Sequence, residues 1–143
     1  MTVRHATFTL ERTYPVPPAR VFAVWADPAA KGRWFVPAGE HELDFRVGGR
    51  ETVDATGPGG TPLAVVSTYH DIVPEQRIVY STTLSGGKTL ATVSVTTVEL
   101  VGEGDATRLV LTEQGTFLDG AEEPAWREQG TGEWLDRLGE ALR

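Results

Sequence analysis

The sequence predicts an α+β fold in which one curved antiparallel sheet of seven strands wraps around a long C-terminal helix. Three observations support this prediction. Segments rich in β-branched residues and joined by short turns occupy most of the chain, a proline-rich helical segment follows the first of them, and an amphipathic segment ends the sequence. A sheet with one apolar face must bury that face, and the closing helix is expected to cover it.

The first strand is expected at residues 8–14, where apolar and polar side chains alternate. The face predicted to point inward consists of Phe8, Leu10, Arg12 and Tyr14. This face therefore contains one arginine. Prolines in the next segment suit the first turn of a helix, and Asp27 and Pro28 are expected to end this helix and to begin a second short one.

Six further strands are expected between turns that contain glycine or proline, at residues 41–46, 50–55, 63–73, 76–84, 89–100 and 106–117. In the fifth of these segments the alternation changes phase after Val95, which indicates a β-bulge near Thr96. In the sixth, Glu113 shares a face with Leu111 and is expected to point inward. Within that segment, Gly115 is expected to end the regular strand, so that Phe117 folds back after it.

The closing helix is expected within residues 121–143. Trp134, Leu138 and Leu142 are spaced at i, i+4 and i+8, which places them on one face. The two glycines at 130 and 132 are expected to interrupt or thin the helix.

Composition bounds the domain organisation and the partners. A chain of 143 residues suits one core of ordinary size, so a single domain is expected over residues 1–143. The formal net charge of −7 and the pI of about 4.9 argue against a nucleic-acid partner, which would need clustered Lys and Arg. The N-terminus lacks an apolar signal region and no apolar run reaches the length of a membrane span, so a cytoplasmic protein without membrane insertion is expected.

The sequence also lacks several motifs that carry chemistry. It contains no Cys, which excludes disulfides, thiolate nucleophiles and thiolate metal sites. His5, His41 and His70 are far apart and have no metal-ligand spacing, so no metal is expected. No phosphate-binding glycine motif and no GxSxG motif occurs, so no cofactor and no serine nucleophile is expected.

Six separated strings carry a resemblance to a known superfamily: ERTYPVPPARVFAVWADP, FRVGGRE, TYHDIVPEQRIVYS, ATVSVTTVEL, TRLVLTEQGTFLDG and REQGTGEWLDRL. In this order the chain resembles the START-like (SRPBCC) helix-grip superfamily, which includes lipid-transfer START domains, pollen allergens and polyketide cyclases. Within it, the chain is similar to the branch named for homologues of the activator of heat-shock protein 90 ATPase. The resemblance implies a helix-grip fold with a cavity between sheet and long helix, where members hold apolar or amphipathic ligands and some catalyse reactions.

Glu113 is the first candidate for chemistry. In the resembled fold the first and last strands are neighbours, so the inward carboxylate of Glu113 is expected beside Arg12. One interpretation is a structural ion pair that keeps Glu113 ionised at neutral pH. The alternative is a general acid or base with a raised pKa, or a ligand anchor.

His70 and Tyr80 are the other candidates for an acid or base. Because Tyr69, His70 and Asp71 are consecutive on a strand, His70 faces away from both neighbours. An inward His70 could transfer a proton, whereas the alternative is a hydrogen-bonded strand histidine. Tyr80 either lines the cavity or is a core tyrosine with a bonded hydroxyl.

The predicted cavity lies between helix residues 126–134 and the strands. Missing side chains at the helix glycines would leave room beside Trp126, and Phe117 is expected to cap the cavity mouth. The complete set of ligand-binding candidates is Tyr69, Tyr80, Val93, Val95, Leu111, Glu113, Phe117, Trp126 and Gly130.

Three functions are compatible with these features. The first is a carrier, sensor or binding protein for a small apolar or aromatic molecule, acting as a monomer or homodimer. The alternative is a cavity enzyme of the polyketide cyclase or dehydratase type that uses one acid or base. The third is a chaperone-interaction module, which only the name of the resembled branch suggests.

Overall fold

Seven strands form one antiparallel sheet in the structure, a computed structural model that describes residues 1–143 except for the side chain of residue 58. The strands are β1 (Val3–Tyr14), β2 (Glu40–Leu43), β3 (Arg50–Thr56), β4 (Pro62–Val73), β5 (Arg77–Gly86), β6 (Thr89–Glu103) and β7 (Ala106–Leu118). The helices are α1 (Pro18–Ala26), α2 (Pro28–Phe35), the short 3-10 helix η1 (Pro58–Gly60) and α3 (Pro124–Ala141).

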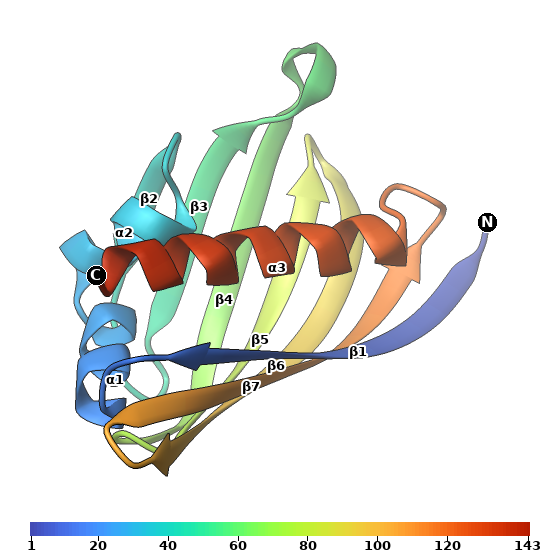
Figure 1. Ribbon diagram of the computed structural model, residues 1–143. Helices are drawn as coiled ribbons and strands as arrows, with labels where there is room; N and C mark the ends of the chain where they lie inside the picture. The colour runs from blue at the N-terminus through green and yellow to red at the C-terminus, as the bar shows by residue number, and fades with distance from the viewer.

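Neighbouring strands follow the order β1-β7-β6-β5-β4-β3-β2, so the first and last strands are adjacent. The sheet curves strongly, and α3 lies across its concave side (Figure 1). Helices α1 and α2 lie near the C-terminal end of α3 (Figure 1). This arrangement confirms the predicted α+β helix-grip fold, including the two short helices after the first strand.

Asp27 and Pro28 set the junction between α1 and α2. The backbone N–H of Ala30 donates to the Asp27 carboxylate at 2.8 Å, which caps the first turn of α2. Pro28 occupies the first position of α2, where no backbone donor is needed. With the start of the helix fixed in this way, Lys31 and Trp34 fall on its buried face.

The inward face of β6 differs from the prediction. Alternation is continuous along the strand, and the buried positions are Thr92, Ser94, Thr96, Val98 and Leu100. The predicted bulge near Thr96 is therefore wrong, and the pairing of β5 with β6 is irregular between Leu84 and Ser85 instead. The inward residues of the first half of β6 carry hydroxyls. Alternation of apolar residues therefore predicts the wrong face for this part of the strand.

Strand β7 continues past Gly115 to Leu118, so the predicted strand end at Gly115 is also wrong. Gly115 pairs with Ala6 of β1 and with Ser94 of β6. A Cβ atom at position 115 would lie 2.9 Å from the ring of Phe117, which is buried. The glycine thus leaves room for this ring inside a regular strand.

Helix α3 runs without a break through positions 130 and 132, so the predicted interruption is wrong. At Gly132 a Cβ atom would lie 3.2 Å from Nη2 of Arg12 and 3.9 Å from Cδ1 of Leu10. The same guanidinium donates to the Gly132 carbonyl at 3.3 Å. This glycine therefore lets the helix approach β1 closely.

The C-terminal half of α3 fills one end of the concave face. The Trp134 ring packs against Trp25, Trp34 and Phe35, with centroids 5.7, 5.5 and 5.3 Å away. Three buried leucines continue this apolar face, namely Leu135, Leu138 and Leu142. These side chains join the hydrophobic core that the sheet forms with α1 and α2, and their removal from water stabilises the fold.

Tyr14 should contribute to stability through one hydrogen bond, since its buried hydroxyl donates to the Leu135 carbonyl at 2.8 Å and joins β1 to α3. We expect Tyr14→Phe to lower the free energy of unfolding by about 1 kcal/mol, the usual net value of such a bond. Tyr14→Ala should cost about 3–5 kcal/mol, because it also opens a cavity. Urea unfolding followed by circular dichroism measures both losses, and equal losses would contradict this division between hydrogen bond and packing.

Candidate ligand-binding site

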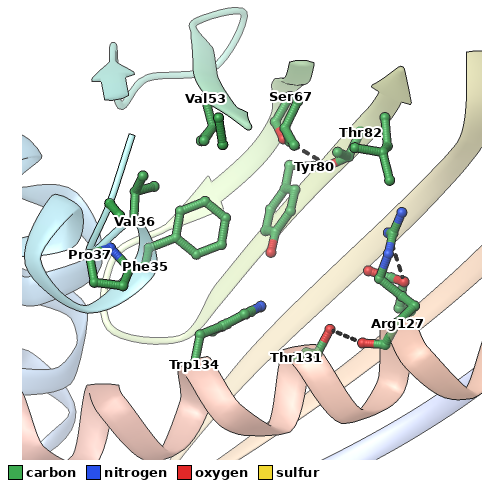
Figure 2. A pocket seen from close by; sticks show the side chains of 15 residues that line it. Phe35, Val36, Pro37, Val53, Ser67, Tyr80, Thr82, Arg127, Thr131 and Trp134 are labelled. Carbon is green, nitrogen blue, oxygen red and sulfur yellow. Dashed lines mark hydrogen bonds and ion pairs between the residues drawn. The ribbon is translucent and has the colours of Figure 1, made fainter. Parts of the chain in front are cut away.

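A cavity of about 300 Å³ lies between the sheet, α3 and the segment that follows α2. Figure 2 shows the side chains that line it. The lining residues are Phe35, Val36, Pro37, Ala38, Val53, Ala55, Val65, Ser67, Tyr80, Thr82, Leu84, Glu113, Arg127, Thr131 and Trp134. Mostly apolar walls with a few polar groups are typical of sites for small molecules.

Three aromatic side chains, Phe35, Tyr80 and Trp134, form part of the walls (Figure 2). Phe35 and Trp134 meet edge to face, with an interplanar angle of 84°. Tyr80 is held from behind by the Tyr69 ring at 5.6 Å, and its hydroxyl points toward α3 (Figure 2). These contacts fix the wall positions before any ligand enters.

The polar end of the cavity is an ion pair between Glu113 of β7 and Arg127 of α3. Nη1 of Arg127 donates to the Glu113 carboxylate at 3.2 Å, and Nη2 donates to the Thr92 hydroxyl at 2.6 Å. The Thr96 hydroxyl donates to the other Glu113 oxygen at 3.3 Å. Glu122 binds the far side of the same guanidinium, at 2.9 Å from Nη2.

Burial and these partners act in opposite directions on the titration of the pair. Burial raises the pKa of Glu113, and the opposing effects of Arg127 and Thr96 only partly offset it. For Arg127, burial alone would lower the pKa, but Glu113 and Glu122 raise it above its usual range. Burial also raises the pKa of Tyr80, and the carboxylates of Glu51 and Glu113 raise it further, so its hydroxyl stays a neutral donor.

The predicted ion pair between Arg12 and Glu113 is wrong. Strand register places Glu113 opposite Phe8, and Arg12 opposite Leu109. Arg12 binds Asp136 of α3 at 2.8 Å instead. Parity correctly placed Glu113 on the inward face, but its cation comes from the helix.

Four predicted ligand-binding or catalytic residues lie away from the cavity. Val93 and Val95 point outward and are 39% and 41% exposed. His70 is exposed as well, and its ring nitrogen is hydrogen-bonded to the Ser81 hydroxyl at 2.7 Å. Trp126 is 63% exposed, so it does not form a pocket wall.

Four other predicted residues lie inside or near the helix-sheet interface but do not line the cavity. Leu111 is part of the core, and Phe117 is buried with its ring centroid 6.0 Å from the Arg127 guanidinium carbon. Tyr69 is buried and bonded to Lys31 and Glu51. A Cβ atom at position 130 would meet open space, so that glycine does not shape the cavity. Of the predicted set, Tyr80 and Glu113 line it.

A buried polar cluster behind the cavity wall was missed by the sequence reasoning. Lys31 is 0% exposed, and its Nζ donates to Glu51 at 2.7 Å and to the Tyr69 hydroxyl at 3.1 Å. Glu51 also accepts from Tyr69 at 2.9 Å and from His41 at 2.7 Å. The Lys31 ammonium lies 4.5 Å from the ring centroid of Phe35, in reach of a cation–π contact.

Strand alternation and helical spacing in the sequence indicate that this cluster and Arg127 lie on inward faces. Glu51 alternates with Val53 on the inward face of β3. Lys31 precedes Phe35 by four residues, which places both on one side of α2. Arg127 stands eight residues before Leu135, on the buried stripe of α3.

Among the residues that the structure describes, no group of three or more His, Cys, Asp or Glu side chains is arranged to hold a metal ion. None of the helices in this part of the chain combines the length and apolar character that a membrane span requires.

The curved sheet, the long helix and the cavity between them define a helix-grip cavity protein. Residues 15–143 match the family described as Activator of Hsp90 ATPase homolog 1-like protein, and the chain belongs to this family. Comparison with curated proteins found no match.

Solved structures support the same assignment. A Rhizobium loti protein is 45% identical, with a TM-score of 0.93 and 99% of both chains covered. A Rhizobium leguminosarum protein is 40% identical, with a TM-score of 0.94, covering 99% of this chain and 96% of that one. DynU16, from the dynemicin biosynthetic locus, is 19% identical with a TM-score of 0.72, covering 95% of this chain and 46% of that one, which shows a likeness of fold alone.

The pH dependence of the free energy of unfolding should show how much the ionised Glu51 carboxylate contributes to stability. Burial would raise its pKa, but Lys31, His41 and Tyr69 together lower the pKa to about 2, from 4.5. Its contribution to stability is therefore present above pH about 4.5 and is lost as the pH falls toward 2. Glu51→Gln should flatten this acid decline, and it should also cost about 3–5 kcal/mol at pH 7 because Lys31 is left buried without a carboxylate.

The matched control removes both charges. In Lys31→Met/Glu51→Gln the amide can still accept from Tyr69 and no unpaired ammonium remains, so the double variant should regain much of the lost stability. Urea unfolding between pH 2 and pH 8 measures all three proteins. A double variant less stable than Glu51→Gln would contradict the ion-pair interpretation.

Proposed function

We propose that the protein binds a small apolar or aromatic molecule in the cavity between the sheet and α3, as a carrier or sensor. The observation that supports this proposal is a cavity of about 300 Å³ with largely apolar walls, including the rings of Phe35, Tyr80 and Trp134. This volume lies at the small end of the range for ligand pockets. Transfer of an apolar ligand from water to such walls is favourable by about 25 cal/mol per Å² of apolar surface buried.

The aromatic walls are held in place by protein contacts, which favours binding without a large ordering cost. Nζ of Lys31 lies 4.5 Å from the Phe35 ring centroid and 5.8 Å from the Tyr80 ring centroid. Its ammonium group therefore contacts both rings. Trp134 is held by the aromatic residues of α1 and α2. A preformed pocket loses less conformational entropy on binding than a pocket that must be ordered.

A pair of tryptophan substitutions tests the site. Val65 lines the cavity from β4, whereas Val93 points outward from β6. Val65→Trp should fill the cavity and weaken binding of a small aromatic such as 2-naphthol by at least about tenfold, the equivalent of about 1.4 kcal/mol. Val93→Trp should leave the affinity unchanged.

Native mass spectrometry of the freshly purified proteins and calorimetric titration with 2-naphthol measure this difference. A molecule that co-purifies with wild type and Val93→Trp but not with Val65→Trp would identify the natural ligand. Equal binding by both variants would contradict the proposed site, and thermal unfolding checks that both remain folded.

A second candidate is an enzyme of the cyclase or dehydratase type that moves a proton within the cavity. The observation that favours it is the position of Glu113 and Tyr80 on one cavity, where burial raises the pKa of the carboxyl group and the phenol remains a donor. Tyr80 could donate to a carbonyl oxygen of the ligand while Glu113 accepts a proton from the adjacent carbon. A third hypothesis, contact with a chaperone, rests on the family description alone.

Deuterium exchange tests the second candidate. If Glu113 is a base, the protein should accelerate exchange of the protons next to the carbonyl of 2-tetralone in D₂O, followed by NMR. Glu113→Gln should remove this acceleration while the ligand affinity stays within about threefold, which corresponds to less than about 1 kcal/mol. Binding without acceleration in wild type would contradict the role of Glu113 as a base and would favour the carrier or sensor function.

A further inference from the structure

The polar end of the cavity contains more negative than positive charge. Glu122 engages the Arg127 guanidinium through Nε, at 3.2 Å from both carboxylate oxygens, and through Nη2 at 2.9 Å. Glu113 receives a single contact from Nη1, at 3.2 Å. Two carboxylates therefore share one cation. Glu113, which lines the cavity, makes fewer hydrogen bonds to Arg127 than Glu122 does.

The donors of Arg127 are largely used by these partners. A guanidinium has five N–H groups. The described hydrogen bonds use the Nε hydrogen, one hydrogen of Nη1 for Glu113, and both hydrogens of Nη2 for Thr92 and Glu122. The paired fork that normally recognises a carboxylate or phosphate is therefore turned toward Glu122, away from a ligand.

Glu113 retains acceptor capacity on the cavity side. One of its oxygens accepts from Thr96 and the other accepts from Arg127. A carboxylate offers about four lone-pair sites, so these two bonds leave room for a donor from a ligand. The Tyr80 hydroxyl lies on the same cavity and can accept from or donate to the same ligand group.

We propose that the cavity selects an aromatic ligand that carries a hydrogen-bond donor, a hydroxyl or a protonated amine, and discriminates against carboxylates and other anions. This proposal rests on the proposed function and specifies the ligand class of the same site. A donor would bind to Glu113. An anion would lie beside that carboxylate, and Arg127, the cation among the described lining residues, is already shared by two carboxylates.

Glu122 is the positioning residue in this scheme. It contacts Arg127 without lining the cavity, so it acts on the ligand through the guanidinium. Removing its charge should release part of the guanidinium fork and make the polar end tolerant of anions. The adjacent Glu123 is a matched control, because it pairs with Arg4 at the surface, at 2.8 Å, and carries the same charge.

Calorimetric titration at pH 7 with three probes that share one ring system tests the selectivity: 2-naphthol, 2-naphthylmethylamine and 2-naphthoate. Wild type should bind the alcohol and the amine at least about tenfold more tightly than the carboxylate. Glu122→Gln should reduce this preference to within about threefold, while the affinity for 2-naphthol is retained and shows that the site is intact. Glu123→Gln should keep the preference of wild type.

The outcomes separate this inference from the proposed function. If no probe binds wild type, or if Val65→Trp binds all three as wild type does, the cavity is not the binding site and both proposals are overturned. If the probes bind in the cavity but wild type prefers 2-naphthoate, the selectivity alone is overturned. The same holds if Glu122→Gln and Glu123→Gln change the preference equally, because net charge would then explain the effect.

Discussion

Helix α3 packs tightly against one end of the concave face of the sheet and leaves space at the other end. This difference determines the position of both the core and the cavity. A strongly curved sheet must bury its inner face, and one helix crosses the whole of it (Figure 1). Beyond Trp134 the helix presents leucines that close this face. Before Trp134 the inward positions are Thr131 and Arg127, whose side chains leave about 300 Å³ open against β3, β4 and β5. Successive turns of a single helix therefore border the cavity and close the core.

Two buried ion pairs flank this cavity and play different roles. Glu51 accepts from Lys31, Tyr69 and His41, and the Lys31 ammonium lies behind the rings of Phe35 and Tyr80. Each charge there has a partner within hydrogen-bond distance, as a buried pair requires. The pair formed by Glu113 and Arg127 has open volume on one side instead.

The element order, the antiparallel sheet and the inward direction of Glu113 could be read from the sequence, because they follow from local turn chemistry and from alternation over long strands. The face of β6 could not be assigned correctly. Assignment by hydrophobicity assumes an apolar interior, but Thr92 bonds to Arg127 and Thr96 bonds to Glu113, whereas Val93 and Val95 face outward. The rule fails at the site because the interior there is polar.

The partner of Glu113 illustrates a second limit. Strand adjacency was known from the resemblance, and Arg12 was the only inward cation on the first strand, so the pairing was inferred across the sheet. Register separates them, since Arg12 lies opposite Leu109 while Glu113 lies opposite Phe8. Which helix residue reaches a given strand position depends on the crossing angle and height of the helix. Those are set by packing, for example by the close approach at Gly132, and no local pattern encodes them.

The two pairs differ in how far the protein itself compensates the burial of their charges. Apolar residues of similar volume often replace a buried ion pair at no cost, or with a gain of about 1–4 kcal/mol. For Lys31 and Glu51 the compensation comes from within the protein, through four further contacts with Tyr69, His41 and the Phe35 ring. Glu113 has only Thr96 and one nitrogen of Arg127, and burial raises its pKa in spite of them. Its carboxylate is under-compensated at the border of an apolar cavity, and a ligand that donates a hydrogen bond would supply what the protein does not.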